Sequence, residues 1–203
     1  VGYGLIALPL LPHGVRSTAQ EERGEGAVRH AMRNRALLIF LAATVCVTWA
    51  EFQIHSTLPM YLMSLGHSTK TYGLLLSFNG LMIVLFELAI TSWTQRFPPR
   101  SMIALGYGLS ALGVAMTGLA HGVPALAMTV VVWTIGEMIY APVTGAYVTN
   151  LAPPQYRGRY HGMWVLTWSV GMLTGPSIGS WLFSRDPNML WIACGVVGLI
   201  GAT

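Results

Sequence analysis

Charged residues are scarce in this chain of 203 residues. They make up 9% of the sequence, whereas a soluble domain carries about 25%. This scarcity excludes an ordinary soluble domain with a charged surface. Hydrophobic residues make up 54% of the chain, and five of their runs exceed the roughly 18 residues that cross a bilayer as a helix. We therefore expect an integral membrane protein.

Cysteines and metal-binding patterns are scarce too. Cys46 and Cys194 both fall inside apolar runs, so a disulfide framework is not expected. The net charge of +4 does not indicate a nucleic-acid partner, because the basic residues lie in the connections between apolar runs. The H-E-x-x-H arrangement of a zinc enzyme is absent. We expect neither an enzyme nor a bound metal or cofactor.

The apolar runs predict the fold class. In lipid, backbone polar groups must be bonded within their own element, so each run is expected to be a helix. The sequence thus predicts an all-α, polytopic membrane helix bundle over residues 35–203. Because the chain begins with Val1 and its last run stops at Thr203, we expect a fragment of a longer protein. The expected spans are 35–63, 71–93, 101–120, 124–149 and 158–183, followed by 189–203, which is too short to cross.

Basic residues alternate between the connections. One set holds nine of them: five arginines in segment 13–35, and Arg96, Arg100, Arg157 and Arg159. The other set holds only Lys70 and Arg185. Loops rich in lysine and arginine face the cytoplasm in membrane proteins, so the arginine-rich set is expected on that side.

Three of the seven acidic residues lie inside predicted spans: Glu51, Glu87 and Glu137. A charge at the bilayer centre costs on the order of 3 kcal/mol, so such residues usually face a bundle interior or a water-filled cavity. Helical spacing gives each glutamate polar or aromatic neighbours on its own face. The span 101–120 has no ionisable group, and we expect it to be peripheral. The shared faces hold Thr44, Thr48 and His55; Gly73, Ser77, Gly80 and Thr91; and Trp133, Tyr140, Thr144 and Tyr147.

The stretch "TWAEFQIH" puts Glu51 and His55 one helical turn apart. Desolvation disfavours the charged form of a carboxylate, which brings its proton exchange nearer to neutral pH. A histidine one turn away can share that proton, relay it or form a charged partner. The alternative is a Glu–His hydrogen bond that only joins helices. Glu87 lies nearer the cytoplasmic end, where it serves either transport or a brace for the Arg96 loop.

The stretch "GMLTGPSIG" places Gly171, Gly175 and Gly179 on one face of the fifth span. Such spacing lets helix backbones approach closely, and Pro176 removes one hydrogen-bond donor and permits a kink. The pattern predicts tight packing and, as a second role, a bending point. Two tryptophans on the same helix are either cavity walls or interfacial anchors: Trp164 and Trp168.

Three motifs resemble a transporter family. The loop "WTQRFPPRSMIALG" is similar to the Gly-x-x-x-Asp-Arg-x-Gly-Arg-Arg signature, with Arg96 and Arg100 at its basic positions, but Gln95 and two prolines depart from it. "NLAPPQYRGRYHG" and "GMLTGPSIG" resemble loop and helix patterns of drug–proton antiporters. Together they resemble the C-terminal half of a major facilitator superfamily transporter, a fold of 12 helices.

The resemblance implies a domain organisation and a mechanism. Residues 1–12 would end helix 6, 13–34 would form the central cytoplasmic loop, and 35–203 would supply helices 7–12, the last one truncated. Two six-helix halves would rock about a central site, with helices 7 and 10 lining it, 8 and 11 framing it, and 9 and 12 outside. The implied partners are a small-molecule substrate, protons, the lipid bilayer of the plasma membrane and the N-terminal half.

We expect proton-coupled export of small amphipathic or cationic compounds. Glu51 and Glu137 would take up protons or pair with cationic substrate, and His55 and Glu87 are further candidates. The aromatic side chains would form a wall that tolerates cations: Trp133, Tyr140, Trp164 and Trp168.

Three alternatives stay open. "GEMIYAP" at 136–142 is similar to peptide symporters, which favours a proton-driven importer of peptides or other metabolites. A receptor or regulator with the same fold would not transport at all. An intramembrane enzyme would have only Glu51 and His55 as candidate groups.

Overall fold

The computed structural model describes residues 28–203, and within them every regular element is a helix. The predicted segment 1–12 and most of 13–34 lie outside this range. Residues 28–33 are helical and precede the helix that begins at Arg35. The helices are α3 (Arg35–Ser56), α4 (Leu58–Ser64), α5 (Thr69–Thr94), α6 (Pro99–Met116), α7 (Val123–Leu151), α8 (Arg157–Arg185) and α9 (Pro187–Ala202), with 3-10 turns η1 (Thr117–Leu119) and η2 (Pro154–Tyr156).

Four of these helices are long and apolar enough to cross a membrane: α3, α5, α6 with η1, and α7. The α8 helix is long enough, with 29 residues, but it carries more polar residues than the others and falls short of them in apolarity. Of the five membrane spans expected from the sequence, four are therefore present as apolar helices of membrane length. The α9 helix has 16 residues, or about 24 Å at 1.5 Å per residue.

The predicted span 35–63 is divided into α3 and α4 at Thr57. Pro59 lies in the first turn of α4 and has no N–H group, so it cannot continue the hydrogen-bond ladder of α3. The two helices stay joined, because the Thr57 N–H donates to the carbonyl of Gln53 at 2.9 Å. The other predicted spans match their helices to within a few residues.

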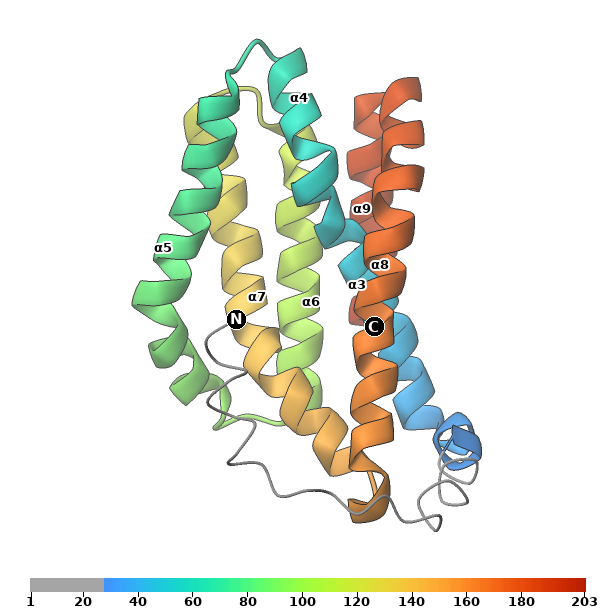
Figure 1. Ribbon diagram of the computed structural model, residues 1–203. Helices are drawn as coiled ribbons and strands as arrows, with labels where there is room; N and C mark the ends of the chain where they lie inside the picture. The colour runs from blue at the N-terminus through green and yellow to red at the C-terminus, as the bar shows by residue number, and fades with distance from the viewer. Residues whose placement is uncertain (1–27) are drawn as a thin grey trace, which may run out of the picture.

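The α6 helix lies in the middle of the bundle, where it packs against α7 and α9 (Figure 1). The expectation that this segment would be peripheral is wrong. Its small residues allow close approach: a Cβ on Gly106 would lie 2.7 Å from Cβ of Tyr140, and one on Gly113 would overlap the backbone of Trp133. The lack of charge in α6 after its first turn thus accompanies close backbone packing against α7. The α5 helix, by contrast, lies at one edge beside α7 (Figure 1).

Two apolar clusters form the core. One gathers Trp49, Leu62 and Trp191 among others, and the second includes Tyr107, Tyr140 and Tyr160. Along α3 the second cluster ends at Val47 and the first begins at Trp49, so Glu51 lies close to the boundary between them. The arginine-rich connections between α5 and α6 and between α7 and α8 lie at the end where α3 begins (Figure 1). The predicted alternation of charge therefore corresponds to two opposite ends of the bundle, and the cytoplasmic position of the basic end stays a prediction.

Candidate functional site

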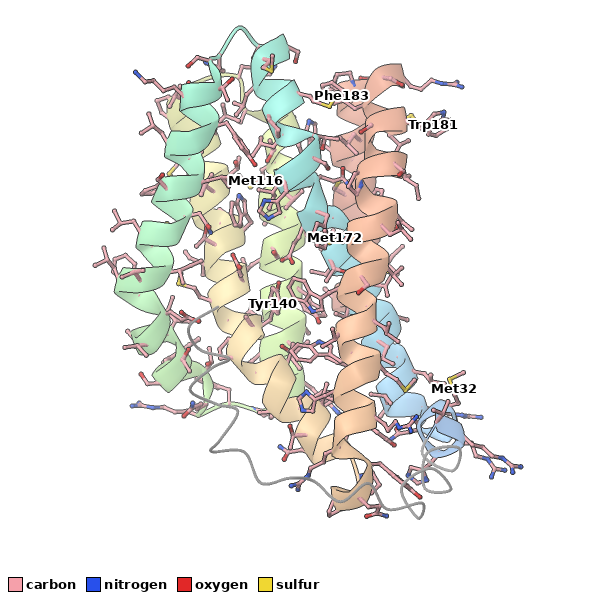
Figure 2. The ribbon with its side chains drawn as sticks, viewed as in Figure 1. Met32, Met116, Tyr140, Met172, Trp181 and Phe183 are labelled. Atoms are coloured by element: carbon pink, nitrogen blue, oxygen red, sulfur yellow. The ribbon has the colours of Figure 1, made fainter. Side chains whose placement is uncertain are left out.

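Glu51 of α3 is held by two other helices. Its Oε1 accepts a hydrogen bond from Ser110 Oγ of α6 at 2.6 Å. Tyr140 of α7 donates its hydroxyl toward both carboxylate oxygens, at 2.9 Å to Oε1 and 2.7 Å to Oε2. Figure 2 shows Tyr140 near the middle of the bundle. Three helices thus converge on one carboxylate, and each of these partners is a neutral hydroxyl.

Tyr140 is itself fixed by its surroundings. It is 2% exposed, and its ring stands edge-on to that of Tyr107 with centroids 4.8 Å apart. The Tyr107 hydroxyl in turn shares a 2.8 Å hydrogen bond with Thr44 Oγ1 of α3. This arrangement gives the donor to Glu51 a single position, so Tyr140 supports the carboxylate rather than forming a cavity wall as predicted.

Glu51 opens onto a small cavity of about 80 Å³. Glu137 of α7 lines the same cavity, so two of the three predicted glutamates come together there. A pair of indole rings on its wall gives the space an apolar, cation-tolerant surface. The lining residues are Glu51, Phe52, Ile54, His55, Trp133, Glu137 and Trp168.

Glu137 has its own polar neighbours. Asn79 of α5 donates from Nδ2 to Thr134 Oγ1 at 3.0 Å and to Glu137 Oε2 at 3.5 Å. Thr134 is fully buried, and it lies one turn before Glu137 on α7. The second glutamate is therefore joined to α5, while the first is joined to α6 and α7.

His55 lines the cavity but is not the hydrogen-bond partner of Glu51 in the described part of the chain. It is exposed, and its ring centroid lies 6.3 Å from that of Phe52. One helical turn brings the two side chains to the same face, but Tyr140 and Ser110 occupy the carboxylate. The pairing considered from the sequence is thus replaced by bonds to other helices.

Trp164 does not line this cavity. It lies one turn nearer the start of α8, where its ring centroid is 5.8 Å from that of His161. The imidazole Nε2 of His161 is 2.8 Å from Thr149 Oγ1 of α7. Of the two tryptophans predicted on this helix, only Trp168 reaches the cavity.

The glycines of α8 pack against α3. A Cβ on Gly171 would lie 2.7 Å from Thr48 Oγ1, and one on Gly175 would lie 3.0 Å from Cβ of Phe52. A Cβ on Gly179 would overlap the side chain of Gln53. The predicted tight packing is present, and α8 continues as a helix through Pro176.

Gln53 fills the space that these glycines leave. It is fully buried, and its Nε2 donates to the carbonyls of Trp49 and Gly175, both at 3.0 Å. Its Oε1 accepts from Thr57 Oγ1 at 3.1 Å. One amide therefore joins α3, α8 and the break before α4.

Glu87 and the four loop arginines lie apart from the cavity. Glu87 is half-buried near the arginine-rich end of α5. The arginines are exposed near the helix ends at the same side of the bundle: Arg96, Arg100, Arg157 and Arg159.

Sequence reasoning missed four polar residues of this region: Asn79, Ser110, Thr134 and Gln53. The amides Asn79 and Gln53 inside apolar runs were available signals, since buried amides seek partners. Ser110 and Thr134 gave no such signal, because both residue types are common at ordinary helix contacts in membranes. Within residues 28–203 no cluster of three His, Cys, Asp or Glu side chains could hold a metal ion.

A helical bundle with membrane-length spans and carboxylates around a cavity between the helices has the architecture of a secondary transporter. The sequence profile of the Major Facilitator Superfamily matches residues 40–203. The chain therefore belongs to this family of membrane transporters, which are not enzymes.

Three curated relatives illustrate the similarity. The uncharacterized MFS-type transporter YqjV of Bacillus subtilis is 29% identical over 184 residues, which is 87% of this chain and 45% of the relative. The Na(+), Li(+), K(+)/H(+) antiporter of Planococcus maritimus is 23% identical over 71% of this chain and 38% of its own length. The multidrug resistance protein MdtH of Cronobacter sakazakii is 33% identical over 68% of this chain and 33% of its own length. The chain thus spans a third to just under half of these relatives.

Proposed function

We propose that this chain is the C-terminal half of a proton-coupled exporter of small amphipathic or cationic compounds. In this proposal α3 with α4 is helix 7, and α5 to α9 are helices 8 to 12. Residues 1–12 and 13–34 would be the end of helix 6 and the central cytoplasmic loop. The arginine-rich end would face the cytoplasm, and the protein would lie in the plasma membrane.

The observation that carries the proposal is the cavity with two carboxylates. Glu51 and Glu137 face one space together with the indoles of Trp133 and Trp168. A carboxylate surrounded by neutral hydroxyls has no fixed positive partner, so it is free to take a proton or a cation. Flat aromatic walls favour organic cations.

The coupling follows from competition for one carboxylate. When a proton occupies Glu51 or Glu137, the negative charge that attracts a cationic substrate is gone. When substrate occupies the cavity, the proton must leave. If the two halves rock around this site, proton entry from one side then drives substrate release to that side. The names of the MdtH relative and of the cation/proton antiporter relative support this direction.

A second candidate is exchange of alkali cations for protons, which the name of the Planococcus maritimus relative favours. Asn79 and Thr134 would then add polar ligands beside Glu137. The importer suggested by "GEMIYAP" is a third candidate. The exporter is preferred because the cavity has aromatic walls, which a small hydrated ion does not need.

The test uses inverted membrane vesicles that contain the full-length protein. A proton gradient is established, a panel of lipophilic cations and alkali salts is added, and a pH-sensitive dye reports proton release. Glu51→Gln and Glu137→Gln are compared with Thr174→Val, whose hydroxyl is exposed and bonds only within α8. Release with lipophilic cations that is lost in either glutamine variant supports the exporter.

Other outcomes separate the candidates. Release with alkali salts alone supports cation exchange. No response across the panel moves the assignment to an importer. A response unchanged in both glutamine variants means that the glutamates are structural and that coupling resides in the other half.

A further inference from the structure

Within residues 28–203, α5 is the least buried of the four membrane-length helices. Only 11% of the most apolar stretch of α5 is buried, whereas about half of the corresponding stretch is buried in α3, α6 and α7. A Cβ on Gly73 or Gly80 would meet nothing within 4 Å, so neither glycine of α5 forms a close backbone contact with another helix. Its packing partners are α7 and, at the opposite end from the arginines, α4. Small changes at the α5–α7 contact are therefore expected to move α5 before any other helix.

Asn79 lies in the middle of that contact. The buried residues Leu75 and Met82 are four positions before it and three after it, so all three share one face of α5. Asn79 donates from that face to Thr134 at 3.0 Å and to Glu137 at 3.5 Å. These are the hydrogen bonds that join α5 to α7 side chains among the described residues.

The strength of the Asn79 link depends on the charge of Glu137. A hydrogen bond to an ionised carboxylate is roughly twice as strong as one to a neutral group. A proton on the carboxyl group of Glu137, or a cation bound to its oxygens, therefore weakens the hydrogen bond from the amide of Asn79. The bond to Thr134 does not change with charge, so it keeps Asn79 in reach of Glu137.

We propose that Asn79 is a positioning residue that couples the charge of Glu137 to the position of α5. A charged Glu137 holds α5 against α7, and a protonated or cation-paired Glu137 releases it. This inference rests on the proposed function, because it uses Glu137 as a group that gains and loses a proton or a cation. It adds the element that would respond and the residue through which it responds.

Other titratable groups face Glu137. Glu51 and His55 of α3 share the cavity of Glu137. Glu87 lies on α5, about two turns beyond Asn79. The neighbour from α8 is the neutral Trp168. The α6 helix, which packs against α7, carries its one charged residue in its first turn. The test therefore needs variants at Asn79 itself, so that its contribution is separated from these groups.

The experiment measures the position of α5 in the full-length protein. Spin labels at Leu88 of α5 and Leu105 of α6, both exposed, report the distance between the helices from high to low pH. In otherwise wild-type protein we expect a longer and broader distance at low pH, with a shift of about 1–2 Å, as in other helix movements. Glu137→Gln should show the low-pH distance at every pH.

The variants at Asn79 decide the matter. Asn79→Leu should also show the low-pH distance at every pH. Asn79→Asp should reverse the response, because two carboxylates repel at high pH and share a proton at low pH. Ser77→Ala, which changes an exposed hydroxyl two residues earlier on α5, should behave as wild type.

Two results would overturn the inference: a pH response that survives Asn79→Leu, or no pH response in otherwise wild-type protein. Proton release is measured on the same variants. This second readout distinguishes a failure of the proposed function from a failure of the coupling through Asn79. If Glu137→Gln loses proton release while α5 ignores pH, the proposed function stands and the coupling through Asn79 is wrong. If Glu137→Gln changes neither readout, the proposed use of Glu137 is wrong as well.

Discussion

Gly136 is the position at which the packing of α6 and α7 can be tested most directly. A Cβ at Gly136 would lie 2.5 Å from the backbone N of Ser110 and 2.7 Å from the carbonyl O of Gly106. Ordinary van der Waals contact begins at 3.4 Å, so Gly136→Ala requires about 0.9 Å of separation (3.4 minus 2.5). Both atoms belong to the backbone of α6, so no side-chain rotation provides this space.

The displacement has a cost and a consequence for the site. Overpacking of this kind costs about 1–3 kcal/mol. Ser110 would move away from α7 with its backbone, and its 2.6 Å bond to Glu51 would be strained or lost. We therefore expect Gly136→Ala to lower both thermal stability and substrate-driven proton release.

Gly80→Ala is the matched control. Nothing lies within 4 Å of a Cβ at Gly80, yet the change gives α5 the same gain in helix propensity. The difference in Tm between the two variants then isolates the steric cost. The entropy of unfolding grows with chain length, so for a protein about twice as long as this chain the cost of about 1–3 kcal/mol corresponds to about 1–4 °C. The Tm is read from thermal unfolding of the full-length protein in detergent. Equal Tm values would refute the close contact between α6 and α7.

Three further predictions follow from the same contacts. Tyr140→Phe removes the hydroxyl that donates to both oxygens of Glu51 but keeps the ring. The rate of proton release should fall about tenfold or more, since hydrogen bonds to charged groups contribute about 1.5–3 kcal/mol. An unchanged rate would mean that the hydroxyl is not used. Gln53→Leu removes the one side-chain hydrogen bond from Gln53 to α8, the bond to the carbonyl of Gly175. At about 0.6 kcal/mol for an interhelical bond, the free energy of unfolding should fall by about 0.6 kcal/mol. A Tm equal to that of the parent protein would contradict the assignment. The orientation of the bundle in the membrane is tested with cysteine labelling. Ser68→Cys should react with an impermeant maleimide on intact cells, and Phe97→Cys should react only after permeabilisation. The reverse pattern would mean that the arginine-rich end faces outward.

Helix positions could be predicted from the sequence with little loss. Apolar runs of membrane length must be helical because lipid offers the backbone no partners. One boundary was not anticipated, the break at Thr57, although Pro59 was visible as its cause. The low apolarity of α8 was visible too, but its length and glycine pattern suggested a span.

Part of the candidate site also followed from the sequence. Glu51, His55 and Glu137, together with Trp133 and Trp168, were singled out as polar or aromatic residues on helix faces, and all five line one cavity. An ionisable group in a span must face something other than lipid, so its presence alone indicates the interior.

The tertiary structure decided which residues meet. Helical periodicity assigns a side chain to a face of its own helix, but it does not say which helix lies opposite. Glu51 therefore has Tyr140 and Ser110 as partners instead of His55, and Asn79 joins Glu137. The central position of α6 was hidden for the same reason: glycines and serines carry no charge or bulk to mark a face, and their effect appears only when a second backbone comes within contact distance.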